Sequence, residues 1–148
     1  MIAIVGTRFP SLYGIEVAEF FTEEFVRAGC IIVSGFARGI DITAHRTCLE
    51  MEASNVAVLG CGVDFIYPPE HKTYEEKMLR LGCFMSEFPE KTPPLKMNFP
   101  QRNRIIAGMC DATVVIEAPE KSGALITAEF ALDFNREIFA VPGNIRQK

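Results

Sequence analysis

Two short polar segments contain the residue types that hold phosphate groups. Each directly follows an apolar run, and together they contribute Gly6, Thr7, Arg8, Ser34, Gly35, Arg38 and Gly39. Glycine lets the backbone approach a ligand closely, a hydroxyl donates a hydrogen bond, and a guanidinium grips a phosphate through two N–H groups. Either segment alone would also fit a surface turn with an exposed arginine. The repetition of the pattern favours anion binding.

A third segment, Lys121, Ser122 and Gly123, opens a predicted helix that runs to Leu132. Backbone N–H groups at the start of a helix attract anions. An ordinary N-cap explains Ser122 equally well, whereas a glycine weakens a helix and needs another reason. The glycine therefore favours binding, and the serine leaves both interpretations open.

Basic residues concentrate between Lys91 and Met109, where the sequence contains no Asp or Glu. The whole chain carries a net charge of −4 with a pI of about 5.2, which argues against a nucleic-acid partner. The position of the cations matters more than the total charge, so a local basic patch remains compatible with such a partner. The basic and amide side chains in the middle of this stretch are Lys96, Arg102, Asn103 and Arg104.

Phe99, in the same stretch, offers a ring on which a nucleobase could stack. Proteins hold single strands with aromatic rings in a basic groove, at about 1–3 kcal/mol per stacked base. Asn103 could then bond a base edge or a phosphate. Two alternatives stay open: Phe99 could plug the core beside Pro100, and Arg104 could pair with Glu117.

The sequence lacks the motifs of common nucleotide-dependent enzymes and hydrolases. It has no GxxxxGK[ST], complete GxGxxG, GxSxG or HExxH segment. His45 is interpreted as structural, and nothing in the sequence pairs Glu87 or Glu117 with a second catalytic group. The five cysteines show neither CxxC nor zinc-ligand spacing, so we predict reduced, packing residues. We expect no enzyme activity, no metal and no cofactor.

The polar segments follow short apolar runs that alternate with stretches of helical periodicity. Residues 17–28 place Phe20, Phe21 and Phe25 on one face of a helix, which ends at Gly29. This alternation predicts a three-layer α/β fold, an extended Rossmann-like, mainly parallel sheet with helices on both faces. Ligands of such sheets bind at the carboxyl ends of the strands. The predicted strands are Ile2–Val5, Ile31–Val33, Val56–Leu59, Cys83–Met85, Thr113–Ile116 and Ile138–Val141.

Residues 1–148 are predicted to form one domain, because the chain is long enough to bury its own core. No apolar run approaches the roughly 20 residues that span a bilayer, and the start of the chain lacks the features of a signal peptide. We therefore expect a cytosolic protein without membrane contact. The abrupt ends suggest an excised domain.

Seven segments, taken in order, resemble the DprA/Smf family of DNA-processing proteins. They are IVGTRFPSLYG, SGFARGIDITAH, AVLGCGVDFIYPPEH, SEFP, FPQRNRIIAG, EAPEKSGALITAEFAL and FAVPGNI. The resemblance implies a Rossmann-like core that binds single-stranded DNA without strong sequence preference. It also implies a role in natural transformation and in loading of the RecA recombinase, with no catalysis and no cofactor.

The same resemblance implies roles for single residues. Arg8 matches the family's DNA-binding arginine, and Lys96 with Phe99 matches its basic and aromatic pair. Many members also have an N-terminal helical domain and a C-terminal winged-helix domain, neither of which is present in these 148 residues. A segment after VPGNI that contributes to a homodimer in the family is missing too, so dimerisation and RecA contact rest on the resemblance alone.

An enzyme that acts on nucleoside monophosphates is the alternative. Phosphoribohydrolases have a related fold with phosphate loops, and they typically carry a PGGxGTxxE segment. This chain has EKSGALITAE at the comparable place, which keeps Glu129 but lacks the paired glycines. The difference favours binding over catalysis.

Overall fold

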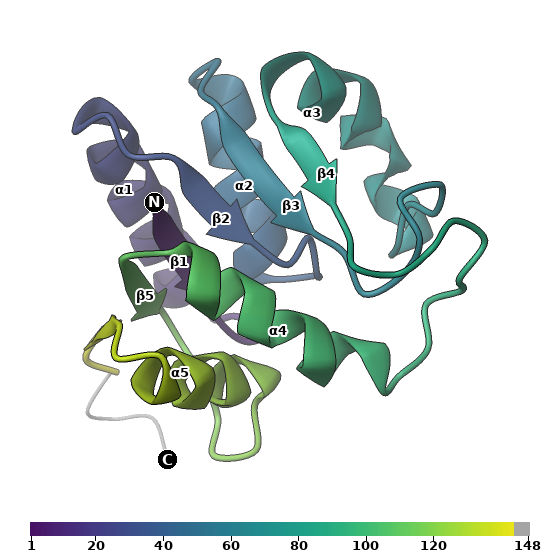
Figure 1. The fold of residues 1–148 in the computed structure, drawn as a ribbon. Coiled ribbons are helices and arrows are strands. Elements are labelled where there is room, and N and C mark those ends of the chain that lie inside the picture. Colours follow the sequence, from purple (N-terminus) through teal and green to yellow (C-terminus); the bar gives the residue numbers. More distant parts are fainter. Residues whose placement is uncertain (144–148) are drawn as a thin grey trace.

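One parallel β-sheet organises the fold (Figure 1). A computed structural model describes residues 1–143. Within them, six strands lie in the order β4-β3-β2-β1-β5-β6, and every neighbouring pair is parallel. The predicted α/β class is confirmed. The strands are β1 (Ile2–Val5), β2 (Ile32–Ser34), β3 (Asn55–Val58), β4 (Cys83–Met85), β5 (Ala112–Val115) and β6 (Glu137–Ala140).

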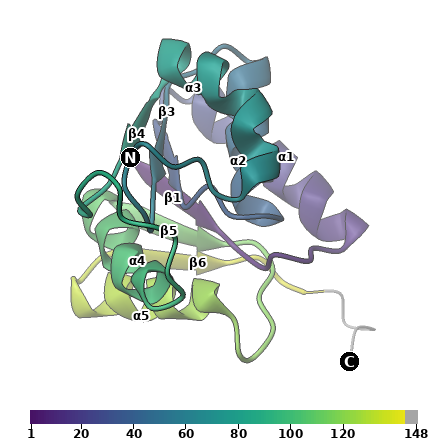
Figure 2. The ribbon, with the colours of Figure 1, turned by 90° about the vertical axis from the view of Figure 1, so that its right-hand side faces the viewer.

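Helices cover both faces of the sheet, as predicted. Figures 1 and 2 show α4 and α5 on one face, and α1, α2 and α3 on the other. Across residues 1–143, none of the helices combines the length and the apolar character needed to cross a bilayer. The helical elements are α1 (Leu12–Arg27), α2 (Ile40–Glu50), the 3₁₀ turn η1 (Pro69–Tyr74), α3 (Glu75–Leu81), α4 (Asn98–Met109) and α5 (Gly123–Asp133).

The central strand β1 is apolar on both faces because helices cover both. Val5 belongs to the cluster that contains Ile106 of α4, whereas Ile4 belongs to the cluster that contains Ala18 of α1 and Ala44 of α2. Burial of side chains the size of valine or isoleucine stabilises the fold by about 1.5–3 kcal/mol each. This packing fixes β1 between β2 and β5, so the loops that follow these strands emerge at the same edge.

Helix α1 ends before the predicted Gly29 but does not bury the whole of its predicted face. The Ser11 hydroxyl accepts a hydrogen bond from a backbone N–H of the first turn (3.0 Å), and Gly29 beyond the helix has φ of +79°. Phe21 packs against the core, but Phe20 is 59% exposed and Ala28 is exposed as well. Consecutive helical residues point about 100° apart, so a helix that buries Phe21 turns Phe20 toward solvent.

Candidate nucleic-acid interface

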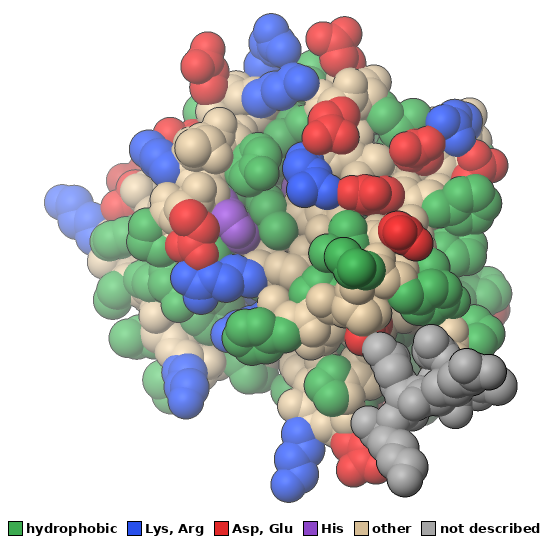
Figure 3. Space-filling model, turned by 180° about the vertical axis from the view of Figure 1, so that it is seen from behind, with side chains coloured by type: hydrophobic (Ala, Val, Ile, Leu, Met, Phe, Trp, Pro, Cys, Tyr) green, Lys and Arg blue, Asp and Glu red, His purple; other side chains and the backbone are tan. Residues whose placement is uncertain are grey.

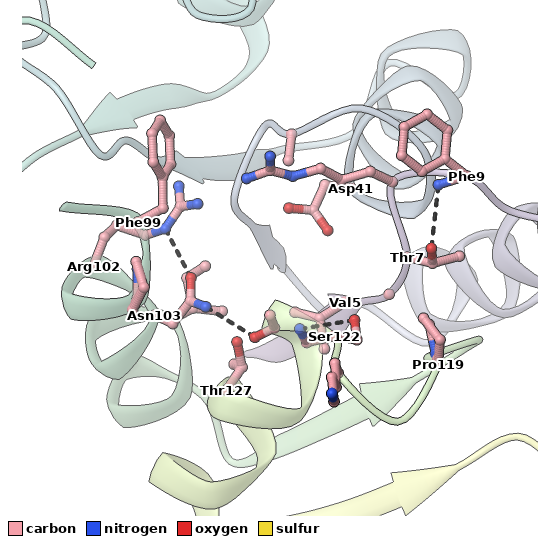
Figure 4. Close-up of a pocket in the computed structure, with 18 of the residues that line it drawn as sticks. Val5, Thr7, Phe9, Asp41, Phe99, Arg102, Asn103, Pro119, Ser122 and Thr127 are labelled. Atoms are coloured by element: carbon pink, nitrogen blue, oxygen red, sulfur yellow. Dashed lines mark hydrogen bonds between the residues drawn. The ribbon is translucent and has the colours of Figure 1, made fainter. Parts of the chain in front are cut away.

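A pocket of about 510 Å³ opens where the carboxyl ends of β1 and β5 face the N-terminal ends of α4 and α5 (Figure 4). We call it the strand-tip pocket. Residues far apart in the sequence meet here because parallel strands direct their following loops to one edge. The predicted site residues that line it are Gly6, Thr7, Arg8, Lys96, Phe99, Arg102, Asn103, Ser122 and Gly123.

Gly6 and Gly39 bring the first two polar loops into contact. A Cβ on Gly39, which has φ of +77°, would lie 2.2 Å from the Thr7 carbonyl oxygen. A Cβ on Gly6 would lie 2.4 Å from Cγ1 of Ile40, and the Ile40 N–H donates to the Thr7 carbonyl (3.1 Å). Packing of one loop on the other, rather than approach of a phosphate, therefore explains both glycines.

Ser34 and Gly35 lie behind the wall of the strand-tip pocket. The Ser34 side chain is fully buried, and its hydroxyl donates to the Ile4 carbonyl oxygen (2.6 Å). The Gly35 N–H donates to the Asp41 carboxylate (3.1 Å). The predicted contact of Ser34 with DNA finds no support in this geometry, because its hydroxyl is enclosed and its proton is already used within the fold. Both residues instead hold the loop that follows β2.

Arg102 and Asn103 tie α4 to the neighbouring loops. Arg102 is only 3% exposed, and its guanidinium donates to the carbonyl oxygens of Gly35 (2.8 Å) and Val58. Its Nε donates to the Asn103 side-chain oxygen (3.0 Å), and the Asn103 amide donates to the Gly123 carbonyl (3.1 Å) (Figure 4). These groups were predicted to contact DNA directly. Both residues line the pocket, and their hydrogen bonds to the scaffold fix its shape, while their contact with DNA stays a prediction.

Asp41 places a carboxylate at the floor of the strand-tip pocket. The side chain is buried, and loss of solvation raises its pKa to about 6, although the charge of Arg102 and backbone N–H groups oppose the rise. Burial in turn lowers the pKa of Arg102 to about 10, which leaves it charged at neutral pH. Asp41 lies in the first turn of α2. Its carboxylate accepts from Gly35 in the preceding loop, and the N-cap of α2 is Gly39 without a side-chain bond.

The Phe99 ring contacts side chains from several segments that line the pocket. The guanidinium carbons of Arg8 and Arg102 each lie 5.7 Å from the centroid of its ring, and the Tyr67 ring lies 5.6 Å away. A Cβ on Gly60 would come within 2.8 Å of the ring. Phe99 is half-buried, so it is neither the core plug of the alternative interpretation nor a fully open platform.

Arg38 and Arg104 are exposed and form ion pairs. Arg38 pairs with Glu70 beside a small hollow of about 20 Å³ that adjoins Arg8 and Phe99. Arg104 pairs with Glu87, outside the strand-tip pocket. The suggested pairing of Arg104 with Glu117 is wrong, because Glu117 accepts instead from the backbone N–H and the hydroxyl of Ser11 (3.0 and 2.9 Å).

The third predicted segment begins α5 at the pocket. Ser122 is the N-cap, since its hydroxyl accepts from the Ala124 N–H (3.2 Å). Gly123 has open space around it, with no atom within 4 Å of a Cβ built there. The cap explains the serine, whereas the packing of the fold does not explain the glycine.

The histidines and cysteines are not among the residues that line the strand-tip pocket. His45 is buried with its Nδ1 2.7 Å from the Asn55 side-chain oxygen, and burial lowers its pKa to about 4. It is therefore a neutral structural residue, as predicted. Among residues 1–143, no three His, Cys, Asp or Glu side chains gather as a metal site, and the five cysteines are free, with Cys48, Cys61 and Cys110 buried.

Positive charge collects at the strand-tip pocket despite the acidic total. Its lining contains Arg8, Lys96, Arg102 and Lys121, against the single carboxylate of Asp41 within the described part of the chain. The face that carries α1 and α2 mixes acidic, basic and apolar side chains (Figure 3). The basic groups around the pocket are those that the polar loops and the acid-free stretch contribute.

The model of the family "DNA recombination-mediator protein A" matches residues 1–148. The chain belongs to this family. It is 46% identical to Protein Smf of Synechocystis over 97% of the chain and 36% of that relative. The solved structure of DNA processing protein A (DprA) from Streptococcus pneumoniae superposes with a TM-score of 0.89 at 39% identity, over 98% of this chain and 51% of that one.

A second solved DprA, from Helicobacter pylori, is described for its single-stranded DNA binding mode. It superposes with a TM-score of 0.90 at 31% identity, over 99% of this chain and 66% of that one. This DprA-family chain thus spans about a third to two thirds of the relatives it matches. The family resemblance read from the sequence is confirmed, and the three residues that it singled out, Arg8, Lys96 and Phe99, line one pocket.

Phe9, Asp41 and Tyr67 are among the residues that line the DprA-family pocket but were not predicted as site residues. Phe9 directly follows Arg8, so the adjacency of a ring and a guanidinium was a usable signal. Asp41 lies two residues beyond Gly39, the last residue of the second polar segment. Tyr67 reaches the pocket from the long connection between β3 and η1, whose path the pattern of apolar runs does not define.

Proposed function

We propose that this chain binds single-stranded DNA in the strand-tip pocket. The observation that carries the proposal is the convergence of Arg8, Lys96 and Phe99 on one open cavity. Guanidinium and ammonium groups contact phosphates, while aromatic rings and the flat guanidinium plane accept unpaired bases. A volume of about 510 Å³ lies in the range of small-ligand sites, about 300–1,000 Å³, so nucleotide-sized groups fit.

Weak sequence preference follows from the hydrogen bonds already made inside the fold. Arg102 and Asn103 have side chains suited to read base edges, yet Nη1 of Arg102 and the Asn103 amide each donate to backbone carbonyl groups, which restricts how they can turn toward a base. Arg8 and Lys96 remain exposed for contacts with the sugar-phosphate backbone. Stacking and phosphate contact do not depend on which base is present. We therefore propose a sequence-tolerant grip.

The relatives support a role in DNA processing. They are named Protein Smf and DNA processing protein A, and the H. pylori protein is described as binding single-stranded DNA. From the family resemblance in the sequence we extend the proposal to DNA processing in the cytosol during natural transformation, to contact with RecA and to a homodimer. Capture of RecA by the isolated chain in DNA-free buffer, and the mass of the chain in solution, test the last two.

We propose binding without catalysis. The enzyme alternative assigns the acid role to Glu129, which is exposed on α5 and is not among the residues that line the strand-tip pocket. An acid must reach the reacting atoms to within hydrogen-bond distance. Release of free base from AMP by the chain, abolished in Glu129→Gln, would support the enzyme instead.

Fluorescence anisotropy of a labelled oligo(dT) tests the proposed function. We expect Arg8→Ala and Lys96→Ala each to weaken binding and to flatten the slope of log K against log salt by about 0.7, the value for one lost phosphate contact on a single strand. Arg27→Ala is the matched control, because Arg27 is an exposed arginine on α1 that pairs with Glu23 and Glu24. Unchanged affinity and slope in both pocket variants would refute the site.

A further inference from the structure

The ring of Phe9 stands open to solvent at the rim of the strand-tip pocket. It is 86% exposed, the largest value among the large apolar side chains of residues 1–143 that are exposed. Single exposed apolar residues are common on proteins and need no explanation by themselves. Phe9 differs in its position, since it lines the pocket directly beside Arg8 and lies across from Phe99 (Figure 4).

The backbone beneath Phe9 is held firmly. Its N–H donates to the Thr7 hydroxyl (3.2 Å), the Thr7 N–H donates to the Glu117 carbonyl (2.7 Å), and the Thr7 carbonyl accepts from Ile40 (3.1 Å). Gly39 packs against the Thr7 and Arg8 backbone so closely that a Cβ would not fit. A ring presented from a fixed backbone loses little conformational entropy when a ligand covers it.

Phe99, in contrast, is already in contact with protein groups. Arg8 and Arg102 lie over its ring at 5.7 Å, Tyr67 lies at 5.6 Å, and Gly60 approaches its edge. A base that stacked directly on Phe99 would have to displace one of these groups. Phe9, by comparison, lines the same pocket with its ring open to solvent, so a base can stack on it without displacing a protein group.

We propose that Phe9 is a base-stacking residue that takes the nucleobase adjoining a phosphate bound by Arg8. This inference rests on the proposed function and adds a second contact point on the wall opposite Phe99. The surroundings favour an unpaired base over an apolar peptide, because Arg8 and Lys121 line the same pocket and complement a sugar-phosphate backbone. Base stacking is insensitive to base identity, in keeping with a sequence-tolerant grip.

A tryptophan at this position reports stacking directly, because the chain contains none of its own. We expect the fluorescence of the Phe9→Trp variant to be quenched by oligo(dT). An abasic oligomer of equal length, which supplies phosphates without bases, should bind more weakly and leave the fluorescence unchanged. Phe9→Ala should weaken oligo(dT) binding about tenfold, within the range for one lost stacked base, and leave the salt slope unchanged.

Phe20 provides the matched control. It is 59% exposed on α1 and does not line the pocket, so Phe20→Trp should show no quenching and Phe20→Ala no loss of affinity. Binding by anisotropy without quenching in Phe9→Trp, or undiminished affinity in Phe9→Ala, would overturn the role of Phe9 and leave the proposed function standing. No oligo(dT) binding by the unsubstituted chain would overturn both. Quenching by an apolar peptide, and not by oligo(dT), would point to a protein partner and also overturn the proposal.

Discussion

The guanidinium of Arg8 lies 5.7 Å from the centroid of the Phe99 ring, so the loop after β1 meets α4 across the strand-tip pocket. A cation above an aromatic ring gains about 0.5–1 kcal/mol at an exposed site. The contact also orients a long, otherwise mobile side chain. Phe99 thereby fixes the cation that the proposed function assigns to a phosphate.

Removing the ring while keeping apolar volume tests this link. In Phe99→Leu we expect the free energy of unfolding to fall by about 1 kcal/mol, through lost cation–π contacts with Arg8 and Arg102. Oligo(dT) affinity should fall about fivefold, because Arg8 loses its preferred orientation. Urea unfolding and anisotropy measure the two effects. Full affinity in a variant with lowered stability would show that Phe99 serves the fold alone.

Gly39 should tolerate no side chain. Its φ of +77° disfavours other residues, and a Cβ would lie 2.2 Å from the Thr7 carbonyl oxygen. We expect Gly39→Ala to lower the free energy of unfolding by about 2 kcal/mol or more. Thermal unfolding followed by circular dichroism measures the loss. A variant as stable as the original chain would contradict the close loop packing.

Gly123 should behave in the opposite way. A Cβ there meets no atom within 4 Å, and alanine favours the first turn of α5, so Gly123→Ala should stabilise the chain by up to about 1 kcal/mol. If the bare backbone is needed for a phosphate at the helix start, the same variant binds oligo(dT) more weakly. Unfolding and binding measured on one preparation separate the two effects. Unchanged binding would remove Gly123 from the site.

Asp41 should make both stability and binding depend on pH. Burial raises its pKa from 3.8 to about 6, so between these values the folded chain holds a proton that the unfolded chain has lost. Its contribution to stability is therefore present at low pH and declines as the pH rises from about 4 to about 6. The protonated Asp41 carboxyl is also neutral, so it does not repel a phosphate group bound in the pocket. Oligo(dT) affinity should rise about fivefold as the pH falls through 6, for a lost repulsion of about 1 kcal/mol.

Asp41→Asn separates this effect from other titrations. Its amide oxygen still accepts from Gly35, so the loop is retained while the charge is removed. His45, whose pKa is about 4, titrates below this window. Anisotropy from pH 7.5 to pH 5.5, at constant salt, should show the rise in the original chain and a flat profile in the variant. Equal slopes in the two proteins would exclude Asp41 as the cause.

Arg104 should be dispensable for binding. It is exposed, pairs with Glu87 and lies outside the strand-tip pocket, and exposed ion pairs contribute about 0–1 kcal/mol to stability. We expect Arg104→Ala to leave oligo(dT) affinity almost unchanged, whereas Lys96→Ala weakens it. A loss in Arg104→Ala as large as in Lys96→Ala would mean that the strand extends along α4 toward Glu87.

The sheet and the location of the site could be predicted because both depend on local pattern. Each predicted strand overlaps the observed one to within one residue at either end, since short apolar runs stand out in the sequence even at the edge strands β4 and β6, which are largely exposed. Arg8 follows β1 directly, so its position at the sheet edge follows from the parallel order. Lys96 and Phe99 were predicted as site residues from the acid-free stretch that contains them and from the family resemblance.

The role of each polar residue could not be predicted in the same way. Ser34 and Arg102 have the same chemistry whether they face a ligand or a backbone carbonyl, and the depth of a side chain depends on neighbours from other segments. Ser34 donates to the Ile4 carbonyl of the neighbouring strand β1, and Arg102 reaches the carbonyl groups at the ends of β2 and β3. Phe9 was not predicted as a site residue for a different reason. An exposed ring in a turn belongs to no helical or strand periodicity that would single it out.

Competition between single-stranded and duplex DNA tests the central claim most directly. Labelled oligo(dT) is bound to the chain at two salt concentrations and displaced with unlabelled single strand or with duplex of the same length. We expect single strands to displace the probe at lower concentration than duplex, and the preference to disappear when Phe9 and Phe99 are both replaced by alanine. Equal displacement by duplex, unaffected by these substitutions, would contradict the claim that the strand-tip pocket grips unpaired bases.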